Sequence, residues 1–177
     1  EINNKSAYII CPNHTSRFDI ILLFATFPHT FVFMGKRNVS NISIFEWFYN
    51  NTMITFERAS IFSAVKAYRK ADKLLKAGTS VVVFPEGKVP EKHVRLGKFK
   101  PGAFKLAISN QVSIIPITFV DNKNKYPEDD IAIKLGKLRV FMSNPIATTS
   151  GSLNECSVLR DKTYNVINKT LIKYENK

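Results

Sequence analysis

The chain has 177 residues, of which 45% are apolar, 23% charged and 12% aromatic. This length allows one domain whose core needs neither a disulfide framework nor a metal. The apolar fraction, with only seven glycines and eight prolines, excludes a fibrous or disordered chain. The longest purely apolar run, Ile20–Ala25, is far shorter than the ~20 residues of a membrane-spanning helix.

Positive charge is the most uneven feature of the composition. Twenty-six Lys and Arg against fourteen Asp and Glu give a net charge of +12. Such a chain is attracted to nucleic acid, to anionic membrane surfaces or to phosphorylated small molecules, and charge alone does not choose among them. The two cysteines, Cys11 and Cys156, cannot form a disulfide framework and indicate a reducing compartment.

Short apolar runs alternate along the chain with amphipathic stretches. The predicted strands are Ala7–Ile10, Phe31–Met34, Met53–Phe56, Ser80–Phe84 and Ser113–Val120, followed by a predicted hairpin of Ile131–Leu135 and Leu138–Ser143. The predicted helices are Ser16–Phe27, Ile42–Tyr49, Ser60–Ala77, Pro101–Asn110 and Leu153–Tyr174. We therefore expect a single α/β domain over residues 1–177, with a mainly parallel central sheet flanked by helices on both faces.

The clearest of these helices is Ser60–Ala77, and Gly78 follows it at the position of a helix C-cap. Its predicted apolar stripe consists of Ile61, Val65, Tyr68 and Leu75. The residues predicted to face mostly away from the core are Lys66, Arg69, Lys70, Lys73 and Lys76.

The loop after the first predicted strand carries two residues suited to proton transfer. Sites in parallel sheets lie beyond the carboxyl ends of the strands. A carboxylate such as Asp19, bonded to one nitrogen of His14, leaves the other nitrogen as a base for a hydroxyl. Five residues turn ~500° on a helix, so this contact requires His14 in the loop and Asp19 in the following helix. The alternative is a surface histidine beside an aspartate that favours the helix dipole.

Four short motifs follow one another from residue 13 to residue 117. They are Asn13-His14-x-x-x-x-Asp19, Ile54-Thr55-Phe56-Glu57-Arg58, Val83-Phe84-Pro85-Glu86-Gly87 and Ser113-Ile114-Ile115-Pro116-Ile117. In this order they resemble the signatures of the glycerolipid acyltransferases, the 1-acylglycerol-3-phosphate acyltransferase family. Three positions depart from the family pattern: Glu57 replaces Asp, Lys88 replaces Thr, and Ser113 replaces Pro. The resemblance implies that Lys88 lies at the substrate site, so this change leaves the acceptor open.

The resemblance implies transfer of a fatty acyl group from acyl-CoA or acyl carrier protein to the free sn-2 hydroxyl of 1-acylglycerol-3-phosphate, which gives phosphatidic acid. It implies that His14 is the general base and Asp19 its orienting partner, with no acyl-enzyme. The chain contains no Gly-x-Ser-x-Gly elbow. A nucleophilic role for Cys11 stays open, although a small buried residue is the favoured interpretation. We expect no metal and no cofactor other than the thioester co-substrate.

The predicted substrate-binding residues are Asn13, Arg17, Arg58, Glu86, Gly87, Lys98, Lys100 and Lys105. Arg58 has the planar fork that matches phosphate, although an exposed salt bridge with Glu57 is an alternative. Glu86 is expected to bond the glycerol or to hold Arg58, unless it is an ordinary turn carboxylate. Oxyanion donors are expected among the backbone N–H groups near Gly87 or in the His14 loop. The basic segment from Lys88 to Lys105 suits phosphate or membrane contact, or simply a solvated loop.

Both expected substrates carry acyl chains, so we expect the protein to work at an anionic membrane surface, on the cytoplasmic face of a bacterial inner or plasma membrane. The aromatic stretch Ile42–Tyr49 suits an interfacial helix, the mouth of an acyl tunnel or a core helix. Relatives commonly carry hydrophobic segments before the first signature, so we expect such an anchor to be missing here.

Three other functions remain to be compared with this one. Acylation of another lysolipid, such as a lyso-ornithine lipid or a lysophospholipid, would keep the chemistry and change the acceptor. A nucleic-acid-binding module is suggested by charge alone, but Ile42–Tyr49 contains no Lys or Arg beside its aromatic rings, which counts against this partner. An inactive lipid-binding relative is disfavoured because His14, Asp19, Arg58 and Glu86 are all present.

Overall fold

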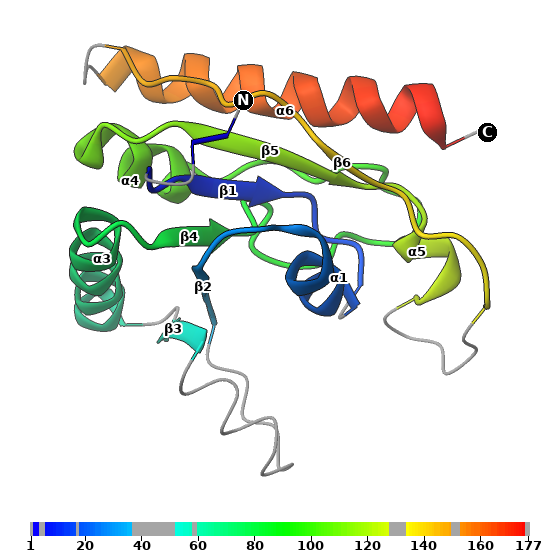
Figure 1. Ribbon diagram of the computed structural model, residues 1–177, viewed down its shortest axis with the longest axis horizontal. Coiled ribbons are helices and arrows are strands. Elements are labelled where there is room, and N and C mark those ends of the chain that lie inside the picture. The colour runs from blue at the N-terminus through cyan, green and yellow to red at the C-terminus, as the bar shows by residue number, and fades with distance from the viewer. Residues whose placement is uncertain are drawn as a thin grey trace, which may run out of the picture.

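The computed structural model describes residues 2–3, 6–16, 18–36, 52–57, 60–127, 134–149 and 153–175. The strands in these ranges are β1 (Ile9–Pro12), β2 (Phe31–Lys36), β3 (Met53–Phe56), β4 (Ser80–Val83), β5 (Ile114–Phe119) and β6 (Val140–Met142). The helices are α1 (Phe18–Thr26), α3 (Ile61–Lys76), α4 (Gly102–Asn110), α5 (Asn122–Lys125) and α6 (Leu153–Tyr174) (Figure 1). The predicted helix Ile42–Tyr49 lies outside the described residues.

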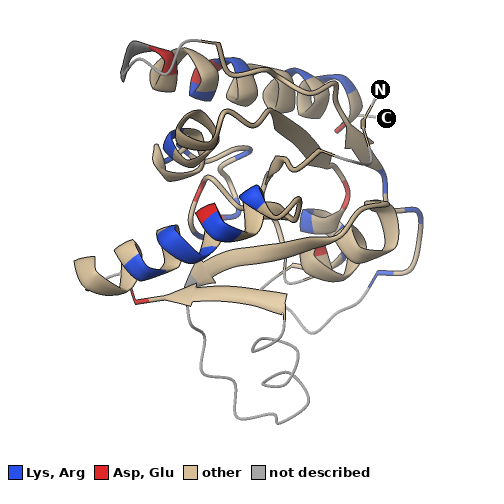
Figure 2. Cartoon of the chain, turned by 60° about the vertical axis from the view of Figure 1, so that its left-hand side comes forward, with Lys and Arg blue, Asp and Glu red and all other residues tan. Residues whose placement is uncertain are grey.

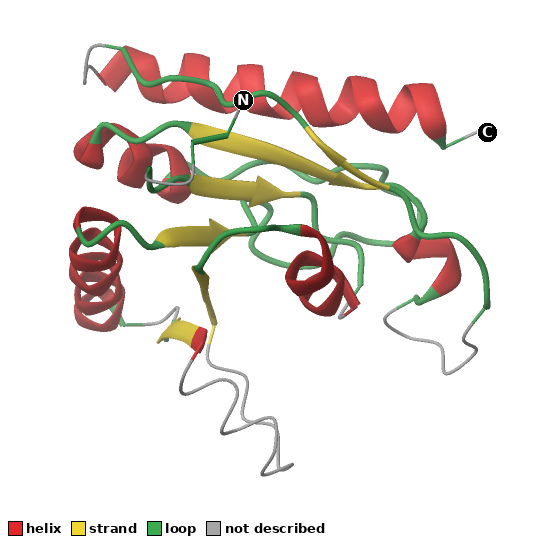
Figure 3. Ribbon diagram, viewed as in Figure 1, coloured by secondary structure: helices red, strands yellow, loops and turns green. Residues whose placement is uncertain are grey.

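The strands form one sheet in the order β3-β2-β4-β1-β5-β6. All pairs are parallel except β5 with β6. The central strand β1 pairs on both sides, with Ile9 opposite Val81 of β4 and Ile114 of β5. Strands that alternate with helices and pair in parallel confirm the predicted fold class (Figure 3).

Helices cover both faces of the sheet, and the side chains of β1 alternate between the two cores. Ile9 belongs to the core shared with α3, α4 and α6, which contribute Ala71, Leu106 and Ile167. Ile10 points to the opposite core, which is shared with α1. Strands buried on both faces read as continuous apolar runs, which is why the sequence predicted them so directly.

The predicted hairpin is wrong in the part that the structure describes. Val140–Met142 is a strand, but it pairs antiparallel with β5, with Thr118 opposite Phe141. Lys134 and Leu135 are not in a strand, and residues 131–133 lie outside the described ranges. The apolar alternation of residues 138–143 predicted an extended segment. It did not predict the strand with which this segment pairs, because that depends on which edge of the sheet is open.

The predicted apolar stripe of α3 is wrong at its first turns. The buried residues are Ala67, Ala71 and Leu75, which lie four residues apart along one line of the helix. Ile61 and Val65 are 84% and 45% exposed. Small alanines let the helix lie close to the sheet, and the larger apolar residues of the first two turns lie beside that line.

Both ends of α3 are capped as its sequence allows. The Ser60 hydroxyl accepts from the Ser63 N–H at 3.1 Å. At the other end Gly78 has φ +86°, and its N–H donates to Leu75 O while the next N–H donates to Leu74 O. These two bonds form a Schellman motif, which confirms the predicted role of Gly78 at the helix end.

Within the described ranges, none of the helices has the length and hydropathy that a bilayer crossing requires.

Candidate active site

The carboxyl ends of β1 and β4 bring two loops together. These strands are parallel neighbours, so the segments that follow them leave the sheet at the same edge. The first segment carries His14 and the second carries Glu86. The N–H of His14 donates to Glu86 Oε1 at 2.7 Å, although the two residues are 72 positions apart in sequence.

His14 and Asp19 are in contact, as their spacing predicted. The distance from His14 Nδ1 to Asp19 Oδ2 is 2.9 Å. His14 lies in the loop after β1, and Asp19 is the second residue of α1. The His14 side chain is 20% exposed, whereas the Asp19 side chain is fully buried. The alternative of a surface histidine is therefore wrong, although Asp19 does lie in the first turn of α1, as that alternative also required.

The carboxylate of Asp19 is held by four further donors. They are Thr15 N (2.6 Å), Thr15 Oγ1 (2.9 Å), Ser16 N (2.9 Å) and Asn122 Nδ2 (2.7 Å). The Ser16 hydroxyl in turn accepts from Phe18 N at 3.2 Å, so Ser16 and Asp19 together cap the start of α1. A buried charge with this many donors is stabilised and fixed in direction.

The imidazole of His14 is held in place by packing as well as by hydrogen bonding. Its ring stacks on Phe84, with the centroids 4.0 Å apart and the planes at 22°. Because Nδ1 faces the carboxylate, Nε2 is the nitrogen left to accept a proton. His14 also lines the cavity described below, so the ring borders the space that a substrate would enter.

Glu86 fixes the backbone on both sides of the site. Its Oε1 accepts from His14 N, and its Oε2 accepts from Gly97 N at 2.6 Å. Burial raises the pKa of Glu86 to about 7, although the two N–H donors oppose this shift. We predicted that Glu86 binds the glycerol or holds Arg58. Its described contacts are instead to the backbone, and Arg58 lies outside the described residues.

The prediction that Asn13 binds substrate is wrong. Asn13 is 1% exposed. Its Nδ2 donates to Phe119 O at 3.0 Å, and its Oδ1 accepts from Phe119 N at 2.8 Å. The side chain thus continues the ladder between β1 and β5 beyond Pro12, so both of its polar groups already have backbone partners.

A cavity of about 720 Å³ opens beside His14. Its apolar lining includes Phe33, Met34, Met53, Phe56, Phe84 and Leu106. Ala64 and Tyr68 of α3 form part of the wall, and two cations, Lys88 and Lys100, also line the cavity. An apolar wall with two cations fits a ligand that has a hydrocarbon chain and an anionic group.

Gly87 makes room for Lys100 at the cavity. Gly87 has φ +73°, and a Cβ on this residue would lie 3.1 Å from Lys100 Nζ. A side chain here would be strained by the backbone and would press on the lysine. Gly87 and Lys100, which were both predicted to bind substrate, line the cavity. Lys98 and Lys105 are exposed and do not line it, and Arg17 lies outside the described residues.

Asn122 is the most distant in sequence of the Asp19 partners that the sequence interpretation missed. It is fully buried at the start of α5, directly after β5, and it reaches Asp19 across 103 positions of sequence. The rule that sites follow the carboxyl ends of strands does cover this loop. Nothing in the local sequence, however, distinguishes Asn122 from the other polar residues around it.

Cys11 is not placed to be a nucleophile. It lies within β1 with no exposed surface, and burial raises the pKa of its thiol well above the ordinary value. A buried, protonated thiol is inert, so the favoured interpretation of Cys11 as a small core residue is confirmed.

Comparison with known proteins identifies the family. The acyltransferase family model matches residues 1–120. The chain belongs to the acyltransferase family. The matched segment contains the His14 loop, Glu86 and every described residue that lines the cavity.

Two curated relatives and one solved structure resemble this acyltransferase domain. The chloroplastic 1-acyl-sn-glycerol-3-phosphate acyltransferase of Arabidopsis thaliana is 34% identical over 136 residues, covering 76% of this chain and 38% of the relative. The enzyme of the same name from Borreliella burgdorferi is 33% identical over 128 residues, covering 70% of this chain and 49% of the relative. The chain thus spans less than half the length of either relative.

The solved structure is PlsC, the 1-acyl-sn-glycerophosphate acyltransferase of Thermotoga maritima. It matches with a TM-score of 0.82 at 23% identity, over 99% of this chain and 69% of that protein. At this identity the likeness establishes the shared fold of the acyltransferase domain.

Proposed function

We propose that this acyltransferase moves a fatty acyl group from a thioester to the sn-2 hydroxyl of 1-acylglycerol-3-phosphate, which gives phosphatidic acid. The donor is acyl-CoA or acyl carrier protein. The observation that carries the proposal is the His14–Asp19 pair at the wall of an apolar cavity that also holds Lys88 and Lys100. The names of the two curated relatives support the same acceptor.

His14 acts as the general base in this proposal. Its Nε2 takes the proton of the acceptor hydroxyl while the hydroxyl oxygen attacks the thioester carbonyl. The resulting tetrahedral intermediate collapses with cleavage of the C–S bond, and the imidazolium returns the proton to the leaving thiolate. Asp19 stabilises the imidazolium and holds the ring in its tautomer. The reaction needs no cofactor beyond the thioester.

Several backbone N–H groups near the base are already engaged. His14 N donates to Glu86, and Thr15 N and Ser16 N both donate to Asp19. Gly87 N donates to Phe84 O. These four groups stabilise the loops rather than an oxyanion, so charge at the carbonyl oxygen must be met by groups other than these four.

The cavity divides into parts that suit the two ends of the acceptor. Its apolar wall suits an acyl chain, because burial of hydrocarbon is favourable by ~25 cal/mol per Å². Lys88 and Lys100 suit the phosphate, with Arg58 as a further ligand by family resemblance. We infer that such substrates are drawn from an anionic membrane surface, to which a chain of net charge +12 is attracted.

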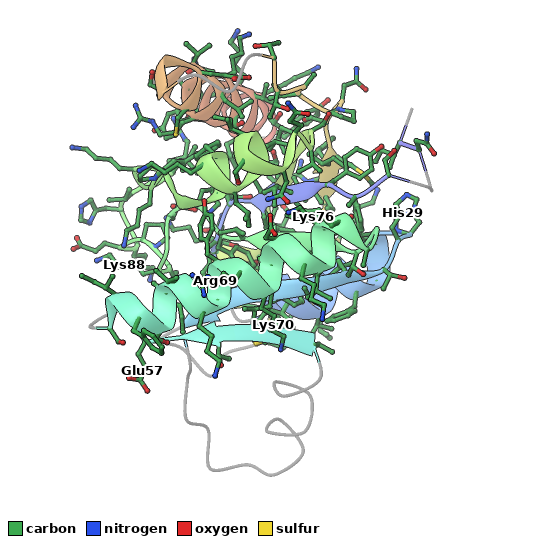
Figure 4. The ribbon with its side chains drawn as sticks, turned by 90° about the vertical axis from the view of Figure 1, so that its left-hand side faces the viewer. His29, Glu57, Arg69, Lys70, Lys76 and Lys88 are labelled. Atoms are coloured by element: carbon green, nitrogen blue, oxygen red, sulfur yellow. The ribbon has the colours of Figure 1, made fainter. Side chains whose placement is uncertain are left out.

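Substitution of His14 tests this function. We expect His14→Ala to lower thioester-dependent acylation of 1-acylglycerol-3-phosphate by about 10²–10⁴-fold, the usual contribution of a general base. Release of free thiol measures the rate. The matched control is His29→Ala, because His29 precedes the amino end of β2, whereas the His14 loop lies at the carboxyl ends of the strands, and Figure 4 shows His29 on the opposite side of the view from Lys88. Full activity of the His14 variant would overturn the mechanism.

A panel of acceptors tests the substrate. Lys88 lines the cavity where the family pattern has Thr, and this difference leaves the headgroup of the acceptor open. We expect 1-acylglycerol-3-phosphate to be preferred over lysophosphatidylcholine and a lyso-ornithine lipid. Preference for either of the other two would keep the chemistry and replace the acceptor.

A further inference from the structure

The first two turns of α3 expose large apolar side chains. Ile61 and Phe62 are 84% and 83% exposed, and Val65 is 45% exposed. An isolated exposed apolar residue is ordinary, but three on neighbouring positions of one helix form a patch. The core does not use this patch, because α3 packs through Ala67, Ala71 and Leu75.

Cations continue the same exposed face along the helix. The exposed cationic residues of α3 are Lys66, Arg69, Lys70, Lys73 and Lys76. Figure 2 shows blue bands along α3, and Figure 4 shows Arg69, Lys70 and Lys76 on the side of this helix that is turned to the viewer. The acidic residue on this helix, Asp72, pairs with Lys76 at 2.9 Å.

The apolar patch lies at the cavity end of the helix. α3 begins where β3 ends, so its first turn lies at the carboxyl edge of the sheet, where the His14 and Glu86 loops also lie. Ala64 and Tyr68, on the adjoining side of the same two turns, line the cavity. Figure 4 shows both Lys88 and Glu57 at this end of α3. The patch therefore borders the place where an acyl chain would enter.

We propose that α3 docks this domain on an anionic lipid surface. Ile61, Phe62 and Val65 enter the interface between headgroups and acyl chains, and the cations beside them contact lipid phosphates. This assignment rests on the proposed function, since it gives the lipid substrates a short path into the cavity. An anionic bilayer complements both the apolar part and the cationic part of this face. A second copy of this chain would instead place its five cations opposite the same five cations.

Vesicle flotation tests the docking face. We expect the protein to bind vesicles of phosphatidylcholine with phosphatidylglycerol more strongly than phosphatidylcholine alone. Ile61→Ser with Phe62→Ser should lower binding to the anionic vesicles at least about tenfold, because two interfacial side chains are lost. Lys66→Gln with Lys70→Gln should lower it also, and should weaken its dependence on phosphatidylglycerol.

The matched control is Val158→Ser with Ile172→Ser on α6. These residues are 49% and 52% exposed on a helix that packs on β5 and α4. Their loss should leave vesicle binding unchanged. Equal binding to anionic vesicles by wild type and by the Ile61→Ser, Phe62→Ser variant would overturn the proposal. So would a wild-type dimer that the α3 variant converts to monomer, as measured by light scattering, since the face would then be an interface between copies.

Activity on dispersed substrates separates this inference from the proposed function. With a short-chain thioester and acceptor below their micellar concentrations, we expect the Ile61→Ser, Phe62→Ser variant to react at the wild-type rate. With substrates in anionic vesicles, its rate should fall together with its binding. Loss of the dispersed-substrate rate in this variant would overturn the docking role. Absence of acylation by wild type, with vesicle binding intact, would overturn the proposed function and not the docking face.

Discussion

His14 is held by two carboxylates that act on different parts of it. Asp19 orients the ring through Nδ1, and Glu86 holds the backbone N–H. One of the two acids is near His14 in sequence and the other is far away, since Asp19 is five positions from it and Glu86 is 72. A short loop could supply only the first contact, and the neighbouring strand had to supply the second.

The raised pKa of Glu86 predicts a pH-dependent contribution to stability. Burial raises this pKa from 4.5 to about 7. The native state therefore binds more protons than the unfolded chain between these values, so the contribution is fully present below pH 4.5 and is lost as pH rises through 7. We expect the free energy of unfolding of wild type to fall by about 3 kcal/mol over this range relative to Glu86→Gln.

Urea denaturation at several pH values measures this difference. Glu86→Gln also loses one acceptor for a backbone N–H, but that loss is a constant offset and does not change with pH. Glu91→Gln is the control, because the Glu91 side chain is 71% exposed and should give the wild-type pH profile. Parallel profiles for wild type and Glu86→Gln would contradict the prediction.

The hydrogen bond from Asn122 to Asp19 predicts that Asn122 positions the Asp19–His14 pair. Its amide donates to Asp19 Oδ1 at 2.7 Å, and a hydrogen bond to a charged group is worth ~1.5–3 kcal/mol. We expect Asn122→Ala to lower kcat about tenfold with little change in KM, because the loss of this donor lets the Asp19–His14 pair shift. Steady-state kinetics measure the two constants separately.

The control for Asn122 is Asn110→Ala. The Asn110 amide donates to Leu106 O within α4, so this variant should keep the wild-type kcat. A lower stability of Asn122→Ala with unchanged kcat would leave Asn122 as a structural contact and contradict its positioning role.

At the scale of elements, the ends of α3 show which local rules were sufficient. The Ser60 cap and the Gly78 Schellman turn follow from residue type and spacing. The burial of Ala67 and Ala71 was not predicted in this way. The exposure of Ile61 and Val65 was not predicted either, because an apolar residue on a helix can face a core or an interface, and the sequence pattern is the same in both cases.

Two glycine substitutions test the backbone of these elements. Gly78 has φ +86° with open space around it, so Gly78→Ala should destabilise the protein by ~1 kcal/mol through backbone strain alone. Gly102 is also in open space but lies in the first turn of α4 without a positive φ. Gly102→Ala should therefore stabilise by ~0.5–1 kcal/mol. Thermal unfolding measures both variants, and equal effects would contradict the assignment of strain to Gly78.

At the scale of the whole molecule, strand order builds the cavity. The chain places β4 between β2 and β1, so the loops that carry His14 and Glu86 meet while β2, β3 and α3 supply the apolar wall. No single segment contains the cavity. Its size and its direction from His14 follow from how the crossovers place helices on the two faces of the sheet.

Filling the cavity should change the accepted chain length. Ala64 lines the wall, so we expect Ala64→Trp to lower activity with long-chain substrates much more than with short-chain ones, because the added ring occupies the space of several methylene groups. Rates across a series of thioesters and acceptors measure this. Ala77→Trp, at the exposed end of the same helix, is the control. A uniform loss across chain lengths would contradict the assignment of this cavity to the acyl chain.

The sequence alone determined the parallel sheet and the main helices, and its family resemblance indicated the His14–Asp19 pair. Each depends on apolar periodicity or on residues within one loop, where short-range geometry leaves few choices. The tertiary structure alone decided that Glu86 holds the His14 backbone, that Asn122 completes the site, that Asn13 serves the sheet, that 140–142 pairs with β5 and that Ile61 faces outward. These contacts join segments up to 106 positions apart, and only the order of the strands and the face chosen by each helix bring them together.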